Sequence, residues 1–456
     1  MKIQAIAAGV TGLFIVGAAG AVVYSGMAAN QRVDKLIADS ERAQSPVRLV
    51  VVDREQGLAS SSGTVRVSFN GACLGEELES LELAALVRYQ ISHLPGLQGL
   101  SSYSADLVLE GGAAELLQSA SGAAVALHLD SVLGFNARWA SRFTTPALDF
   151  PRDDLRVQVA ASAGEFTQKG QAGAFAWQLP TVMISADAGR FDMQGLSLAG
   201  YVDDHELGLG KQTFALASMT GQGAGMGGGF RMQGLRMDYE TRAEAGVVSS
   251  QVRPSLTLLE AANESFQDLS ASMVWDGLDE QALRAINRAT ANHCQTQISD
   301  EQLQQIEQAL LRLIDRGASF SINDLQGRQS QNRFGATMRI ALAGSEQPGS
   351  AARQSLRDRL SVTADLRVSD GLVPPPLQEM VLGEGYARQV GDALAASLSL
   401  NKGALVLNNE PDAFGLEQTT DMFLAIGDES LQTWRQQIDS GNGPLMALAR
   451  AGRVID

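Results

Sequence analysis

The chain has 456 residues, in which 51 acidic side chains outnumber 35 basic ones, so its formal net charge is −16 and its pI is about 4.8. This charge argues against a nucleic-acid partner, because phosphate binding requires concentrated Lys and Arg. The length allows two or three domains, or one long repetitive sheet.

The chain begins with an apolar segment. Ile3 to Tyr24 contains no charged side chain, and the uncharged run continues to Gln31. As a helix at about 1.5 Å per residue, this run would reach about 43 Å, more than the hydrocarbon core of a bilayer requires. The pattern predicts a membrane anchor at residues 1–29. A cleaved signal peptide is the alternative, since Ala19-Gly20-Ala21 fits the small-x-small cleavage pattern.

The residues after this run favour an anchor that is retained. Val33, Leu36 and Ile37 have helical spacing and predict a juxtamembrane helix at residues 30–45. Within the anchor, small residues such as Gly17 and Ala21 lie on one helical face and would let two copies pack closely. A homodimer therefore stays open as an alternative.

Short alternating runs follow, typical of half-buried strands. Residues 46–71 read as a hairpin with a Gly-centred turn, and residues 78–96 as another strand. The same alternation of apolar and polar residues, with Gly, Asp or Asn between the runs, is found at residues 124–132, 155–162, 175–185, 191–200, 211–220, 230–239 and 268–275.

Helical signals appear at residues 278–293 and, most clearly, at 299–317. In the second segment Ser299 and Gln302 form a capping-box pattern, and Gly317 suits the stop. One apolar stripe runs along this helix, made of Leu303, Ile306, Leu310, Leu311 and Ile314.

Strands return after this helix. Residues 334–344 and 360–371 alternate, and residues 343–355 between them read as an exposed loop. Residues 372–394 combine a rigid Pro segment with a short helix, residues 398–409 predict a hairpin, and residues 428–452 predict one or two helices.

The order of elements predicts a mainly β (α+β) fold: an N-terminal transmembrane helix, then an elongated antiparallel β-rich body with a few covering helices. We divide the chain into 1–29, 30–45, an N-terminal β-rich region at 46–295, and a helix plus β-rich region at 296–456. More than ten one-sided strands each have a face that must leave water. A sandwich with a dry core is the favoured solution, and an open curved sheet covered by helices or lipid is the alternative.

Candidate metal and redox residues are sparse. Cys73 and Cys294 could pair in an oxidising compartment, but nothing in the sequence brings them together. The four histidines, at 93, 128, 205 and 293, are scattered, whereas a zinc site requires three or four ligands. We expect no metal and no cofactor.

The remaining motifs favour structural roles. Gly223, Gly225 and Gly228 match Gly-x-Gly-x-x-Gly but precede an alternating strand rather than a helix, so a flexible loop is the better interpretation. The acidic pairs Asp153-Asp154, Asp203-Asp204 and Glu76-Glu77 read as solvated turn charges.

Two further residue types are interpreted in the same way. His93, before Leu94-Pro95-Gly96, is expected to make a structural hydrogen bond. Trp177, Trp275 and Trp434 are expected to pack in a core or an interface. No residue is proposed as catalytic or cofactor-binding, and we expect no enzymatic activity.

Several stretches resemble the YdgA-like proteins, a family of unknown function found in Gram-negative envelopes. The matching stretches are the apolar N-terminus, residues 51–69, 88–97 (with Leu94 where the family has Gly), 309–344 and 385–411 (with Asn409 where Gly is expected). The resemblance implies a single-pass anchor in the inner membrane with the bulk of the chain in the periplasm. It implies no reaction.

The sequence therefore predicts a membrane-anchored periplasmic protein with a structural or interaction role, with envelope proteins or lipid as partners. The alternative is a lipid-binding or lipid-transfer module that uses an apolar β-sheet groove.

Overall fold

The computed structural model describes residues 47–69, 84–96, 99–152, 154–223, 229–261, 264–290, 299–344, 355–411, 416–440 and 443–445. The predicted anchor, the juxtamembrane helix, Cys73, Cys294, His293 and most of the loop at 343–355 lie outside these ranges. Across the described ranges, no helix combines the length and the apolar character that a membrane span needs.

The chain divides into two compact units. Unit 1 comprises Met1–His205, Phe214–Met226 and Asn292–Gln297, and unit 2 comprises Glu206–Thr213, Gly227–Ala291 and Ile298–Asp456. The strand β12 (Leu209–Gly223) contributes residues to both.

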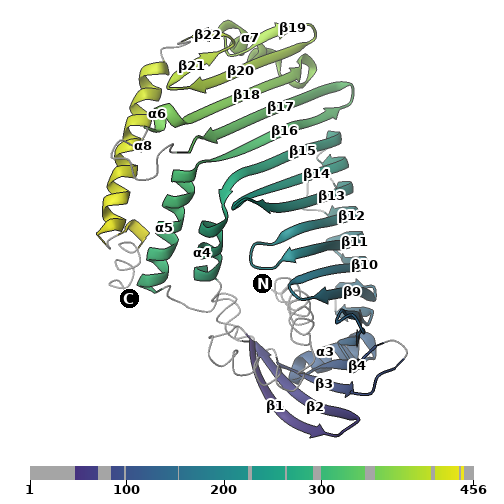
Figure 1. Ribbon diagram of the computed structural model, residues 1–456. Coiled ribbons are helices and arrows are strands. Elements are labelled where there is room, and N and C mark those ends of the chain that lie inside the picture. Colours follow the sequence, from purple (N-terminus) through teal and green to yellow (C-terminus); the bar gives the residue numbers. More distant parts are fainter. Residues whose placement is uncertain are drawn as a thin grey trace, which may run out of the picture. The chain divides into compact units, whose positions relative to one another are not determined.

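Over its described residues, unit 1 is an antiparallel meander with one helix (Figure 1). Its strands are β1 (Val47–Gln56), β2 (Ser60–Phe69), β3 (Ala84–Ser92), β4 (Ser101–Leu109), β5 (Leu127–Leu133), β6 (Trp139–Thr145), β7 (Leu148–Arg152), β8 (Leu155–Val159), β9 (Ser162–Lys169), β10 (Ala172–Ala186) and β11 (Gly189–Asp204). Each strand pairs with its neighbour in sequence, except that β6 pairs with β9 around the β7–β8 hairpin, and both β8 and β9 pair with β10.

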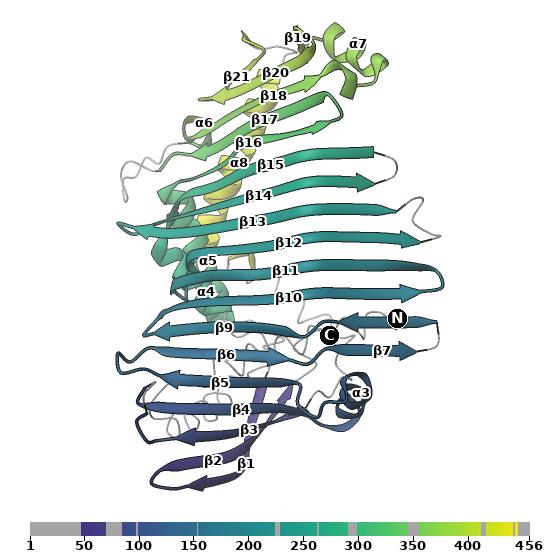
Figure 2. The ribbon, with the colours of Figure 1, turned by 90° about the vertical axis from the view of Figure 1, so that its right-hand side faces the viewer.

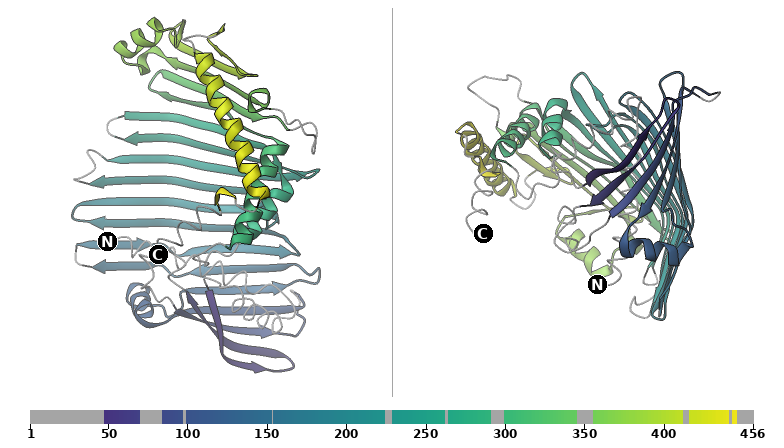
Figure 3. Two further views of the ribbon diagram at one scale, coloured as in Figure 1. Left: turned by 90° about the vertical axis from the view of Figure 1, so that its left-hand side faces the viewer. Right: turned by 90° about the horizontal axis from the view of Figure 1, so that it is seen from below.

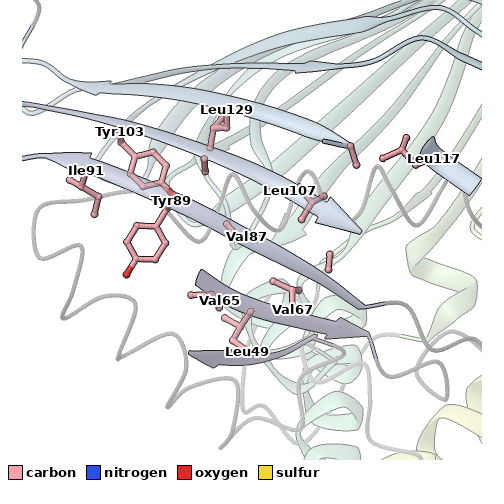
Figure 4. Packing of buried hydrophobic residues seen from close by; sticks show 13 residues of the cluster. Leu49, Val65, Val67, Val87, Tyr89, Ile91, Tyr103, Leu107, Leu117 and Leu129 are labelled. Carbon is pink, nitrogen blue, oxygen red and sulfur yellow. The ribbon is translucent and has the colours of Figure 1, made fainter. Parts of the chain in front are cut away.

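The core of unit 1 follows from the alternation of its strands. Val87, Tyr89 and Ile91 of β3 point to the same side as Tyr103 and their other cross-strand neighbours, and all are at most 7 % exposed. Figure 4 shows this cluster, to which Leu117 of helix α3 (Gly111–Ser121) also belongs. The helix packs against β4 and β7. Unit 1 therefore has a conventional core, in which a helix covers part of the sheet face.

Unit 2 is a second antiparallel meander. Its strands are β13 (Phe230–Glu244), β14 (Val247–Ala261), β15 (Glu264–Asp279), β16 (Ala318–Gln329), β17 (Asn332–Leu342), β18 (Leu360–Ser369), β19 (Arg388–Val390), β20 (Ala393–Asn401), β21 (Ala404–Leu407) and β22 (Glu410–Pro411). β18 pairs with β20, and β19 and β21 pair with β20 at separate places. Figure 2 shows β13 to β18 following one another in chain order.

The helices of unit 2 gather at the ends of its strands. They are α4 (Glu280–Thr290), α5 (Asp300–Arg316), α6 (Leu356–Arg359), α7 (Pro375–Gly383) and α8 (Leu416–Asp439). α4, α5 and α8 stand together at one end of the strands, and α7 lies towards the other end (Figures 1 and 3). Among the described residues of unit 2, the strands therefore form a single layer.

The mainly β, antiparallel prediction is confirmed, but the favoured sandwich is not what unit 2 shows. Strands β13 to β18 each pair with the next along the chain, and β18 pairs with β20, so the described strands of unit 2 form one layer rather than two facing sheets. Several predicted elements are present. They are the strands at 46–71, 360–371 and 398–409 and the helices at 278–293 and 299–317.

The predicted capping box is also present. Ser299 N donates to Gln302 Oε1 at 2.9 Å, and Gln302 N donates to Ser299 Oγ at 3.2 Å.

Asp279 joins β15 to α4 and α5. Its carboxylate is 1 % exposed and accepts from the backbone N of Ala282 at 2.8 Å, as an N-cap does. Arg312 and Arg316 of α5 place guanidinium nitrogens 2.9 and 3.1 Å from the same carboxylate. The buried carboxylate thus caps a helix N-terminus and pairs with two cations. These three partners offset the free-energy cost of removing its charge from water.

We predict that Asp279→Ala destabilises unit 2 by about 3 kcal/mol, because it removes a helix cap and two charge-assisted hydrogen bonds. Thermal unfolding and hydrogen exchange of α4 measure the effect. Glu260→Ala is the control, since the Glu260–Arg231 pair is exposed and its atoms are 3.8 Å apart. Equal stability of the two variants would contradict the role given to Asp279.

Candidate functional site

The residues that the sequence singled out do not converge on one site. His93 lies after β3 and its Nε2 is 2.7 Å from Ser61 Oγ, a hydrogen bond that ties β2 to the end of β3. Gly223 ends β12, while Gly225 and Gly228 lie outside the described residues. Within the described part of the chain, no three His, Cys, Asp or Glu side chains are arranged to hold a metal ion.

The three tryptophans named from the sequence, of four in the chain, lie in separate places. Trp177 of β10 packs against a small cluster in unit 1. Trp275 of β15 lies next to Phe320 of β16, with ring centroids 5.0 Å apart. Trp434 is partly buried on α8. Only Trp275 belongs to the surface described below.

One charged cluster lies on the polar face of the unit 1 sheet. His128 Nδ1 is 2.7 Å from Asp106 and its Nε2 is 3.1 Å from Asp130. The hydrogen bond to Asp106 is the main cause that raises the pKa of His128, because two carboxylate partners favour the protonated ring. All three side chains are at least 43 % exposed, so the cluster is a solvated charge network.

The larger feature is the apolar face of unit 2. Residues directly opposite each other on paired strands share a face of the sheet, so the register defines rows that cross the strands. One such row, the Met338 row, is apolar over eight strands and consists of Tyr239, Val252, Met273, Ile322, Met338, Ala364, Leu398 and Leu407.

Three more rows extend this face along the strands. The Ile340 row contains Trp275, Phe320, Ile340, Val362, Leu400 and Leu405. The Leu366 row contains Leu325, Ala336, Leu366 and Ala396, and the Phe334 row contains Gly327, Phe334, Val368 and Leu394. We call these four rows together the apolar face of unit 2.

The opposite face of the same strands is polar. Between the apolar rows lie rows such as Arg339–Thr363–Ser399 and Thr337–Asp365–Ser397. On β13, Arg236 donates to Asp238 at 2.7 Å, and Gln251 of β14 donates to Ser272 of β15 at 2.9 Å. The sheet is therefore amphipathic, and these polar contacts lie on the side opposite the apolar rows.

Backbone irregularities keep the apolar residues on one side. In β16, Ile322 and Leu325 are three residues apart, yet they pair with Met338 and Ala336 of β17, which are two apart. The extra residue is accommodated at Asp324, whose φ is +54°, and β15 has a similar residue at Asp268, with φ of +51°. Such bulges change the alternation by one position, so Leu325 returns to the apolar side.

Part of this face is not covered by another layer of the described protein. Leu366 is 48 % exposed, Ile340 38 %, and Tyr239 and Leu325 37 %. Core positions of unit 1 such as Ala85 and Val67 are 3 and 7 % exposed by comparison. The face is buried at Leu394 and Leu400, which are 5 and 8 % exposed, so its open part lies around Leu366 and Ile340.

The size of the face is at the upper end of what a monomer ordinarily exposes. The four rows cross eight, six, four and four strands at about 4.8 Å spacing, and neighbouring rows are about 6.6 Å apart. The rows therefore cover about 570 Å², against roughly 300–600 Å² for the largest apolar patch on a typical soluble protein. Patches of this size are often functional.

Unit 1 has a second, smaller apolar cluster, which is buried. Val157 and Val159 of β8 and Leu179 of β10 are buried, and partly buried apolar side chains of β7, β10 and β11 pack around them. Leu198 and Leu196 of β11 pair with Trp177 and Leu179. This cluster is a packed core, unlike the exposed part of the apolar face of unit 2.

We predict that Asp106→Asn lowers the pKa of His128, because the neutral amide no longer favours the charged ring. A His128 pKa that is higher in the folded state than in the unfolded chain, where it is about 6.5, stabilises the fold. This stabilisation is fully present below pH ~6.5 and is lost as the pH rises through the pKa of the folded state. The stability difference between wild type and variant should therefore be largest below pH ~6.5. NMR titration of the ring measures the pKa, with Asp149→Asn as control; an unchanged midpoint in Asp106→Asn would refute the assignment.

We predict that Leu366→Asp changes the unfolding free energy of lipid-free protein by less than about 1 kcal/mol, because Leu366 is already half exposed. Leu394→Asp, on the same face but 5 % exposed, should cost more than about 3 kcal/mol. Urea titration measures both variants. A severe loss at Leu366 would mean that a further protein layer covers the face.

The chain was compared with known proteins. A family model described as bacterial protein of unknown function (DUF945) matches residues 1–412. The chain has no significant match among curated proteins or among solved structures. Because the family match spans most of the 456 residues, the chain belongs to this bacterial family of unknown function.

Proposed function

We propose that this protein binds lipid, and that the apolar face of unit 2 holds the acyl chains. The observation that carries the proposal is the set of four apolar rows, whose most exposed members, Tyr239, Leu325, Ile340 and Leu366, are 37–48 % exposed. An uncovered surface of this kind is unfavourable in water, and an apolar ligand would remove it from solvent.

The chemistry of the face suits acyl chains better than a protein segment. The backbone groups of the inner strands are already paired in the β ladder, so they offer no hydrogen bonds to a partner. An extended protein segment would have to bury unpaired backbone polar groups against this face at a cost, whereas a hydrocarbon chain has none. Met273 and Met338 add flexible, polarisable side chains that adapt to ligands of variable shape.

The second element of the proposal is location. The uncharged run from Ile3 to Tyr24 supports a membrane anchor, and the resemblance to Gram-negative envelope proteins supports the inner membrane with the bulk of the chain in the periplasm. An anchored protein of this kind would have access to membrane lipid. A binding role of this type needs neither a cofactor nor a catalytic group.

A role in protein interaction is the second candidate. Helix α8 exposes Met422, Phe423 and Ile426 at 53, 65 and 52 %, close together over one turn. An exposed apolar stripe on a helix fits a groove on a partner protein or on a second copy of this chain. This stripe lies on a helix and is distinct from the four rows of the sheet.

Site-specific photo-crosslinking tests the proposal. We would place p-benzoylphenylalanine at Leu366, at its neighbour Asp365 on the polar face, and at Phe423, each in the full-length chain within the cell envelope. Because adjacent residues of a strand point to opposite faces, Asp365 is a matched control. We expect lipid adducts at Leu366, and few or none at Asp365.

Two results would contradict the lipid-binding function. One is adduct formation with protein alone at Leu366, which would instead favour a partner or a second copy over the face. The other is equal lipid labelling at Leu366 and Asp365, which would indicate non-specific contact with the membrane. Protein adducts confined to Phe423 would assign the interaction role to α8 without affecting the proposal for the sheet.

A further inference from the structure

Strand β1 of unit 1 has an open edge. It pairs with β2 from Val47↔Phe69 to Gln56↔Ser61, and no other described strand pairs with it. Figure 2 shows β1 as the outermost strand beside β2. The backbone N–H and C=O groups that residues 47–51 direct away from β2 therefore meet no second strand in the described part of the chain. Such an edge is a template for pairing with another strand.

The two halves of β1 differ in their protection against pairing. The second half follows a bulge between Val51 and Asp53, and Asp53, Arg54 and Glu55 are consecutive charges. Bulges and charges are common means by which edge strands avoid association. Residues 47–51 contain neither a bulge nor a proline, and Arg48 is their single charge. The first half of β1 is therefore the part that is open to pairing.

Strand β7 shows how another edge of unit 1 is protected. It pairs with β8 alone among the described strands, but it is only five residues long and contains Pro151. Helix α3 also packs against it. A short strand with a proline and a covering helix is a poor template, so the open edge of β1 is not a general feature of this sheet.

An apolar row of the unit 1 core ends at the edge of β1. Val51 pairs with Val65, Val65 with Val87, and Val87 with Leu107. The three inner members are 4–7 % exposed, whereas Val51 is 37 % exposed. Val51 has a neighbouring strand on one side only, so a strand added beside β1 would cover it. Figure 4 shows Leu49, also on β1, at the margin of the same cluster.

The open half of β1 is complementary to itself. Two copies of one strand can pair antiparallel about a two-fold axis, which places one residue opposite its own copy. With Val50 at the axis, Leu49 lies opposite Val51 of the second copy on the core side of the sheet. Arg48 then lies at the end of the paired segment, opposite the bulge residue Val52, so no like charges meet.

The chain before β1 suits the same partner. Residues 1–29 are the predicted membrane anchor, and residues 30–46 separate it from β1. Small residues in the anchor, such as Gly17 and Ala21, would let two copies pack closely. Two copies held in one membrane would also meet at a raised effective concentration. These features favour a second copy of this chain over an unrelated strand.

We propose that residues 47–51 of β1 form an interface between two copies of this chain, in which the two β1 strands pair antiparallel with Val50 at the two-fold axis. The pairing would join two unit 1 sheets into one continuous sheet and cover Val51. This inference concerns unit 1 and does not depend on the lipid-binding function proposed for unit 2.

Disulfide cross-linking tests the position of the axis. Val50→Cys is made in the full-length chain with Cys73 and Cys294 replaced by serine, and the protein is oxidised in the membrane. Opposed residues of antiparallel strands have Cα atoms about 4.5–5.5 Å apart, which a disulfide can span. We expect a cross-linked dimer. Leu58→Cys is the control, because Leu58 is fully exposed in the turn between β1 and β2 but lies away from the proposed axis.

A charge exchange tests the same position without a covalent bond. Val50→Lys and Val50→Glu would each place two like charges at the axis, so each variant alone should dimerise about tenfold less tightly than wild type. An equimolar mixture of the two variants should dimerise again, because opposite charges then meet. Analytical ultracentrifugation of the full-length protein in detergent measures dimerisation. Circular dichroism confirms that the variants fold, as expected for a position that is already exposed.

Three results would overturn the proposal. The first is no cross-linking of Val50→Cys, or cross-linking no more efficient than that of Leu58→Cys, which would indicate random collision. The second is dimerisation of Val50→Lys and Val50→Glu at wild-type strength, which would mean that another surface holds the copies together. The third is failure of the mixed variants to dimerise, because it would show that the two Val50 positions do not meet.

Discussion

A β-sheet with one apolar face must remove that face from water, and the structure of unit 2 depends on how this requirement is met. In unit 1, helix α3 and the packing of β1 to β5 bury the apolar side, and Tyr89 and Leu107 are 4 % exposed. In unit 2 the described helices stand at the strand ends, so Leu366 and Ile340 stay half exposed. The hydrophobic free energy scales with the apolar area that is buried. Unit 1 gains this free energy by packing its own core, whereas the exposed area of unit 2 would give it to a ligand that covers the sheet.

Maintaining a one-sided face over strands of 11 to 16 residues requires local corrections. A strand alternates strictly, and a single extra residue moves every following side chain to the other face. Asp268 and Asp324 provide the left-handed conformations at which the alternation changes, and the registers on both sides of Asp324 place Ile322 and Leu325 together with β17. The bulges are therefore what allows an apolar face to be continuous despite an irregular sequence pattern.

Sequence reasoning predicted the elements that carry a strong local signal. The alternation of 360–371 and the capping box at Ser299 are encoded in a few neighbouring residues, and both are present. β4, β14 and α3 were missed: β14 contains Pro254 and loses its alternation near Thr257, and α3 begins with two glycines, which are poor helix formers. The choice between a sandwich and a single layer could not be made from the sequence, because local alternation is identical in both. The rows of the sheet can be assigned only once the strand registers are known. The sequence alone shows that Ala336, Ala364 and Ala396 are small residues among larger apolar ones.

The role of this protein depends on what lies against the apolar face of unit 2. The most direct measurement is an experimental density map of the full-length protein, isolated with its native membrane lipid. It should show elongated density, too narrow for a polypeptide, over the Met338 and Leu366 rows. A bare face, or a face covered by a protein segment or by a second copy of the chain, would contradict the account.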